Sequence, residues 1–279
     1  MQNKFYNFFT YFYHRILGRP LCMKKALEIK PKKPELTVVF LHGIAANSST
    51  WKHTFSQLSR EPALAHTRLV ALDLLGFGKS LKADWLDYNY ADYDEALGTA
   101  LNKLHIKTPV IIVGHSMGCL ITAHYAKNHR KCLSGLILVS PPILMQDELA
   151  KLPDKFYLKS YSSLHKLAED PAVKTLAAFI TKVSSFRDKY LKTTAFARSM
   201  ENIILNPNNY KTFEKLNVPT HIIHGHFDPL VYGPNLVRVS KNNPSHLKLY
   251  KVMGDHDLSL TKRKKILTLI EKALKDETL

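Results

Sequence analysis

The stretch Gly114-His115-Ser116-Met117-Gly118 decides the fold of this chain. An apolar run of the strand type precedes it, and a helix-like pattern follows it. A serine between two glycines in this strand–turn–helix context is the pattern of a nucleophile elbow, in which the glycines let the strand and the helix approach closely. The turn lifts the Ser116 hydroxyl out of the sheet edge and places the N–H of Met117 at the start of a helix. We therefore predict that Ser116 is a nucleophile and that the Met117 N–H binds an oxyanion.

A serine nucleophile needs a base, and the base needs a carboxylate that orients it. Two further strand-like runs, 218–225 and 246–253, are each followed by a residue of the required type. Asp228 follows the first run and His256 follows the second. We assign His256 as the general base and then acid, and Asp228 as the carboxylate that fixes its imidazole. Asp257 adjoins His256, but a sequence neighbour rarely has the geometry to orient the ring.

A second oxyanion donor is predicted just after the apolar strand-like run at 36–41. There, Gly43 lets the backbone turn so that the N–H of Ile44 can point toward the nucleophile. The remaining motif residues have expected structural roles, with hydrogen bonding for the two histidines. These structural residues are His42, Gly43, Gly114, His115 and Gly118.

Five motifs in this order resemble those of the α/β-hydrolase superfamily. They lie at 41–44, 73–80, 114–118, 225–228 and 254–256. The resemblance implies an α/β fold with a mainly parallel sheet flanked by helices, a helical cap insertion, and the triad and oxyanion roles assigned above. Serine at position 116 argues against the dehalogenase and epoxide-hydrolase branches, which place aspartate there. The chain departs from the family pattern at Cys119 and Asp255, where glycine is common, and neither change removes a catalytic group.

The domain organisation follows from the alternation of strand-like and helix-like segments from residue 36 onward, which predicts a mainly parallel sheet covered on both faces. Helices are expected at 91–105 and 259–275. After a strand at 134–139, a long stretch has helical patterns and little β character. We expect three parts: an amphipathic aromatic helix at 1–20, a core at 21–144 and 209–279, and a helical cap at 145–208.

Aromatic residues of the predicted cap have two interpretations: most pack the cap against the core, and some line an acyl or aryl pocket. They are Phe156, Tyr157, Tyr161, Phe179, Phe186, Tyr190 and Phe196.

Near the N-terminus, five apolar residues fall at helical spacing and form one stripe. They are Phe5, Phe8, Phe9, Phe12 and Ile16. The stretch is too short and too interrupted for a membrane span or a secretory signal. Two interpretations remain open: the stripe packs onto the protein's own surface or cap, or residues 4–19 associate weakly with an anionic membrane surface.

The formal net charge is +17, but the basic residues are scattered, and no nucleic-acid-binding motif accompanies them. We expect no specific nucleic-acid partner, and we expect the tightest basic run, 262–265, to be a solvated helix face. Three cysteines form no disulfide or metal pattern, which favours the cytoplasm, with peripheral membrane association left open. Histidines at 221, 224 and 226 resemble metal ligands, but no second cluster completes a site, so no metal or cofactor is expected.

Together, these residues predict a carboxylesterase-like serine hydrolase that cleaves a small-molecule ester, with a small to medium acyl or aryl group, through an acyl-enzyme. A C–C bond hydrolase or a thioesterase could use the same triad. A ligand-binding module of the same fold is the non-enzyme alternative.

Overall fold

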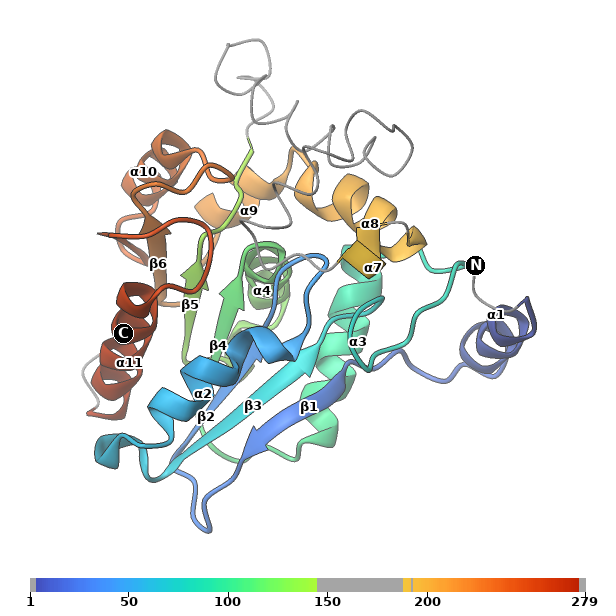
Figure 1. Ribbon diagram of the computed structural model, residues 1–279, viewed down its shortest axis with the longest axis horizontal. Coiled ribbons are helices and arrows are strands. Elements are labelled where there is room, and N and C mark those ends of the chain that lie inside the picture. Colours follow the sequence, from blue (N-terminus) through green and yellow to red (C-terminus); the bar gives the residue numbers. More distant parts are fainter. Residues whose placement is uncertain (1–3, 145–187, 192, 276–279) are drawn as a thin grey trace.

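A seven-stranded sheet, with strand order β1-β3-β2-β4-β5-β6-β7, forms the centre of the molecule (Figure 1). The computed structural model describes residues 4–144, 188–191 and 193–275. The strands are β1 (Lys24–Ile29), β2 (Leu36–Leu41), β3 (Thr67–Asp73), β4 (Val110–His115), β5 (Gly135–Val139), β6 (Thr220–Gly225) and β7 (Leu247–Val252). Neighbouring strands run parallel except β1, which pairs antiparallel with β3. The predicted mainly parallel sheet is therefore confirmed.

Both faces of the sheet are covered, and this explains the continuous apolar runs of the inner strands. Every residue of β2, β3, β4, β5 and β6 is buried. Side chains alternate between two cores: Phe40 and Val113 belong to one, whereas Leu41 and Ile112 belong to the other. A parallel sheet needs such cover, because its strands present apolar side chains on both sides.

Within the described residues, helices on both sides of the sheet supply this cover. The core that contains Phe40 is closed by α2 (Lys52–Leu58) and α11 (Leu260–Leu274). The opposite core is closed by α3 (Tyr90–Lys103), α4 (Met117–Asn128), α9 (Asn209–Glu214) and α10 (Gly233–Asn242). The predicted helices at 91–105 and 259–275 are thus confirmed as α3 and α11, with small shifts at their ends.

Short elements complete the described part of the chain. The 3₁₀ turns there are η2 (Ser48–Trp51), η3 (Pro62–Leu64) and η4 (Arg130–Cys132), and the π-helical turns are η1 (Phe12–Ile16) and η5 (Met200–Ile204). The remaining described α-helices are α1 (Lys4–Tyr11), α7 (Asp188–Leu191) and α8 (Thr194–Ser199).

The cap predicted at 145–208 lies largely outside the described residues, so this boundary stays a prediction. Of its seven aromatics, Tyr190 and Phe196 are described, and both are buried. The Tyr190 hydroxyl accepts a 3.0 Å hydrogen bond from the Gly78 N–H, and its ring packs edge-on against Phe77. These two aromatics therefore pack against the core.

The N-terminal helix is present, but its aromatic stripe does not pack onto the described surface of the protein, and packing onto the cap falls largely outside the described residues. The stripe residues are between 43% and 72% exposed. Instead, the opposite, polar side of α1 contacts the body, with Asn7 bonded to Asp84 and Thr10 to Trp85. Within the described residues, no helix is long and apolar enough to cross a bilayer.

Candidate active site

Ser116 lies at a sharp turn between β4 and α4, and its backbone has the left-handed value φ = 51°. The Ser116 N–H donates to the Val139 carbonyl at 2.9 Å, which ties the turn to β5. A Cβ atom on Gly114 would come within 2.7 Å of the Gly118 carbonyl oxygen, and one on Gly118 within 2.6 Å of the Leu41 carbonyl oxygen. Both positions therefore require glycine, as the elbow motif predicts.

The structure brings together the three residues of the predicted triad. The Ser116 Oγ lies 2.9 Å from His256 Nε2. On the other side of the ring, His256 Nδ1 lies 2.9 Å and 3.0 Å from the two carboxylate oxygens of Asp228. Because a carboxylate can only accept, Nδ1 carries the ring proton, and Nε2 is left to accept the proton of Ser116. This arrangement suits a serine nucleophile with a general base.

The three residues come from the carboxyl ends of three parallel strands of the sheet. Ser116 follows β4, Asp228 follows β6 and His256 follows β7. All three are at least nine-tenths buried. In parallel sheets the carboxyl ends of the strands share one edge, so loops far apart in sequence meet there.

Asp228 is held in its ionised form. Burial alone would raise its pKa, but the charge and hydrogen bond of His256, a hydrogen bond from Ser140 and the charge of Lys262 together hold the pKa well below its usual range. The Leu230 N–H also donates to Asp228 Oδ1 at 3.0 Å. The carboxylate is therefore suited to orient an imidazole and to stabilise its protonated form.

The loop after β2 passes close beside the nucleophile. A Cβ atom on Gly43 would lie only 3.1 Å from the Ser116 Cβ, so this glycine permits the approach. Ile44 follows directly and is buried. Met117 is the first residue of α4, so its N–H has no partner within the helix. These positions agree with the expected pair of oxyanion donors, whose function remains a prediction.

His42 and His115 are buried neutral rings that make structural hydrogen bonds. His42 Nδ1 donates to the Gly43 carbonyl at 2.7 Å, while its Nε2 accepts from the Leu74 N–H at 3.0 Å. His115 Nε2 donates to the His256 carbonyl at 2.9 Å. Burial lowers the pKa of His42 to about 4 and that of His115 to about 3. The two rings fix the loops that carry Gly43 and His256.

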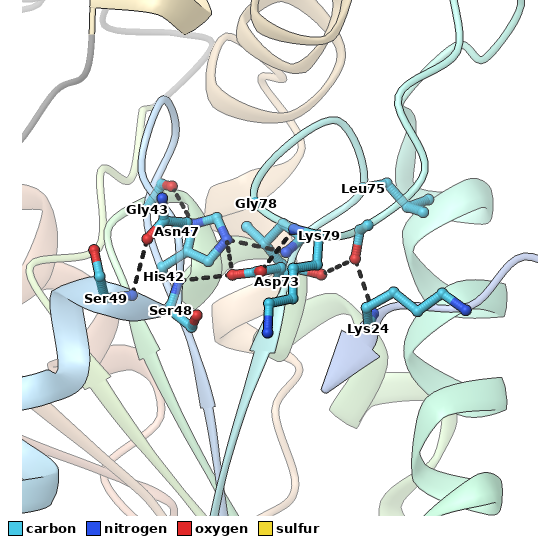
Figure 2. Close-up of polar contacts among 12 residues, drawn as sticks. Lys24, His42, Gly43, Asn47, Ser48, Ser49, Asp73, Leu75, Gly78 and Lys79 are labelled. Carbon is cyan, nitrogen blue, oxygen red and sulfur yellow. Dashed lines mark hydrogen bonds and ion pairs between the residues drawn. The ribbon is translucent and has the colours of Figure 1, made fainter. Parts of the chain in front are cut away.

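Asp73, at the end of β3, joins two of the loops around the site (Figure 2). Its carboxylate accepts the Ser48 N–H at 2.7 Å and the Lys79 N–H at 2.8 Å. A Cβ atom on Gly78 would come within 2.1 Å of this carboxylate, so the turn at 76–78 can close over Asp73 only with glycine there. The loop after β2 is thereby held against the turn after β3.

Two polar residues of the site were missed by the sequence analysis, and one expectation is wrong. The basic run 262–265 was expected to be solvated, yet Lys262 is completely buried. Its Nζ donates to the Ser140 Oγ at 2.8 Å and also to the Asp255 carbonyl. Ser140 in turn helps to hold the pKa of Asp228 low. A lysine within a basic run gives no sequence signal of burial. A serine directly after a strand, such as Ser140, could have been considered as a candidate site residue.

Comparisons with known proteins agree with this fold. The family described as alpha/beta hydrolase fold matches residues 37–262. The chain is 33% identical over 112 residues to "Probable lysophospholipase BODYGUARD 2" of Arabidopsis thaliana, an alignment that covers 40% of this chain and 24% of that protein. It is 29% identical over 123 residues to "Coelenterazine h 2-monooxygenase" of Renilla reniformis, which covers 44% of this chain and 38% of that protein. The chain thus spans well under half the length of either curated relative.

Among solved structures, a bromoperoxidase from Bacillus anthracis superposes with a TM-score of 0.71 at 21% identity, covering 92% of this chain and all of that one. Identity at this level shows the shared fold alone. The family match, in contrast, extends over most of the chain and includes the loops after β2 and β4 as well as those that carry Asp228 and His256. The chain therefore belongs to the alpha/beta hydrolase fold family.

Proposed function

We propose that this chain hydrolyses carboxylic esters, with a small to medium acyl or aryl group, by acyl transfer through Ser116. The observation that carries this proposal is the continuous hydrogen-bonded chain from the Ser116 hydroxyl through His256 to Asp228. Similarity to a relative named as a probable lysophospholipase supports an ester as the substrate class. The other curated relative is named as a monooxygenase, so the proposal rests on the triad geometry rather than on names.

In this proposal the triad and the two backbone donors act in sequence. His256 Nε2 takes the hydroxyl proton as Ser116 Oγ attacks the ester carbonyl carbon. The N–H groups of Ile44 and Met117 stabilise the negative charge on the carbonyl oxygen. The C–O bond to the alcohol then breaks, and the alcohol leaves with the proton from His256. Water, activated by the same ring, hydrolyses the acyl-enzyme and releases the acid.

The first experiment is hydrolysis of p-nitrophenyl esters from acetate to dodecanoate by the wild-type protein and by Ser116→Ala. We expect turnover that depends on Ser116, since the alanine variant keeps the fold but lacks the nucleophile. The preferred chain length would measure the acyl pocket. No turnover by folded wild-type protein across the series would contradict the ester proposal, and equal turnover by both proteins would contradict the nucleophile assignment.

A further inference from the structure

The N-terminal helix presents an apolar surface that is largely exposed to solvent. Phe5, Phe8 and Phe9 are 72%, 68% and 58% exposed, and Ile16 is 60% exposed. Figure 1 shows α1 at the edge of the molecule, outside the helices that flank the sheet. An uncovered apolar patch of this kind marks an interaction site, because isolated domains rarely expose large contiguous aromatic groups to water.

The polar side of the same helix fixes its orientation on the protein. The Asn7 amide donates to Asp84 at 2.8 Å, and the Asp84 N–H donates back to the Asn7 side-chain oxygen at 2.8 Å. Further along, the Trp85 ring N–H donates to Thr10 at 2.9 Å. The helix is therefore attached by its polar residues, and its aromatic stripe is left pointing outward.

The charge around the stripe has a single sign in the sequence. The first 27 residues contain no aspartate or glutamate. They contain the basic residues Lys4, Arg15, Arg19, Lys24 and Lys25. Arg15 pairs with Asp92 at 3.5 Å, whereas Lys4 and Arg19 are exposed. Exposed aromatics beside the exposed basic residues Lys4 and Arg19 are complementary to an anionic lipid surface, where rings enter the interface and cations meet lipid phosphates.

We propose that the N-terminal helix binds the surface of an anionic lipid bilayer, lying in its plane with Phe5, Phe8 and Phe9 inserted at the level of the headgroups. The hydrogen bonds of Asn7 and Thr10 keep the protein body on the opposite side of the helix from the lipid. Binding by one short helix is weak and reversible, so it depends on both the aromatic residues and the charges.

The test is flotation of the full chain with phosphatidylglycerol-rich vesicles and with phosphatidylcholine vesicles. We expect binding to the anionic vesicles that weakens as salt is added. The triple variant Phe5→Ser/Phe8→Ser/Phe9→Ser should lower partitioning at least about tenfold, because three aromatic side chains no longer leave water. The pair Lys4→Gln/Arg19→Gln should reduce the preference for anionic over neutral vesicles.

A matched control is Met253→Ser/Leu260→Ser, which removes two exposed apolar side chains distant in sequence from the helix and should leave vesicle binding unchanged. The proposal is overturned if the wild-type chain does not float with anionic vesicles, or if the triple variant floats equally well. It is also overturned if the wild type binds no lipid but forms a dimer, and the triple substitution dissociates that dimer. In that case the aromatic stripe contacts a second copy of the chain.

An independent observation concerns the buried polar groups behind Asp228. The Lys262 Nζ donates to Ser140 at 2.8 Å, and Ser140 and Lys262 both help to hold the pKa of the Asp228 carboxylate low. Both Ser140 and Lys262 are completely buried, and Ser140 has the left-handed value φ = 55°. Burial of a charged lysine costs free energy unless hydrogen-bond partners compensate for the lost water. The strained backbone of Ser140 adds a further cost.

We propose that Ser140 and Lys262 are positioning residues: Lys262 holds the Ser140 hydroxyl, and Ser140 holds Asp228 in the plane that orients His256. This second proposal rests on the hydrolase function proposed above. The Ser140 hydroxyl accepts a hydrogen bond from Lys262 Nζ, so its own proton is free to donate. Hydrogen-bond donation therefore runs from Lys262 through Ser140 toward Asp228.

A double-mutant cycle tests this positioning role. Ser140→Ala should lower kcat about tenfold with little change in KM, as expected for a lost hydrogen bond to a charged group. In an Asp228→Asn background the same change should have almost no further effect, because Ser140 acts only through that carboxylate. A merely structural role would instead lower activity equally in both backgrounds.

Lys262→Met should reproduce the kcat loss of Ser140→Ala, and Lys264→Met, on the exposed side of α11, is its control. If Lys262→Met does not fold, the cycle with Ser140→Ala still decides the role of the serine. Additive losses in the cycle overturn the positioning proposal while serine-dependent turnover stands. Absence of turnover by the wild type would overturn the proposed function itself.

Discussion

Ser116 occupies a backbone conformation that costs about 1–3 kcal/mol for a residue other than glycine. The surroundings oppose relaxation, because β5 accepts the Ser116 N–H and the glycines at 114 and 118 leave no room for another path of the chain. The strained turn keeps the Ser116 hydroxyl facing His256 Nε2. Little reorganisation is therefore needed when the proton of Ser116 moves to His256.

At the same scale, Asp228→Asn should lower kcat by up to about 10⁴, because an amide can donate to Nδ1 and so favours the tautomer in which Nε2 carries the proton. The fold should survive, since asparagine has nearly the shape of aspartate. Steady-state kinetics on the best p-nitrophenyl ester measures the loss. Asp257→Asn is the matched control; if it proved the more damaging change, the assignment of the carboxylate would be wrong.

The triad residues could be predicted from the sequence because each follows a recognisable strand and the required chemistry limits the residue type. Ser140 and Lys262 could not be predicted in the same way. Lys262 is buried where α11 packs against the loop after β5, and its Nζ there contacts Ser140, which is distant in sequence. Burial of a charged group depends on such tertiary contacts, whereas apolar periodicity is local.

At the scale of elements, local sequence patterns predict the inner strands and the helices α3 and α11. They do not predict β1. β1 begins with two exposed lysines, is half-buried over its next three residues and ends with the exposed Ile29, so it lacks the apolar run of the inner strands. It lies at the edge of the sheet, where charged residues discourage pairing with other chains. Its pairing with β3 is long-range, and no local signal indicates it.

The N-terminal helix shows a different limit of local patterns. The stripe of aromatic residues predicts an amphipathic helix, but it does not indicate which side faces the protein. The polar side makes the contact, because Asn7 and Thr10 find partners in Asp84 and Trp85. Apolar periodicity identifies the helix, and the placement of polar partners elsewhere in the chain decides its orientation.

At the scale of the whole molecule, the buried histidines His42 and His115 link the site loops to global stability. The pKa of His42 is lowered to about 4 and that of His115 to about 3, in each case mainly by burial, from an ordinary value of 6.5. Below pH 6.5 the unfolded chain therefore binds protons that the folded chain does not bind. Stability must fall as the pH falls through this window.

We expect the free energy of unfolding to decrease from pH 6.5 toward pH 4, with each histidine contributing up to ~1.4 kcal/mol per pH unit. Asp228 acts in a lower window: its pKa is depressed, so its stabilisation is complete above its ordinary value of 3.8 and is lost only below it. Urea unfolding at pH 7, 6 and 5 measures the slope. His115→Gln, which removes one of the titrating rings, should make the dependence on pH shallower. A free energy of unfolding that stays constant between pH 7 and 5 would show that these rings are not held neutral by the fold.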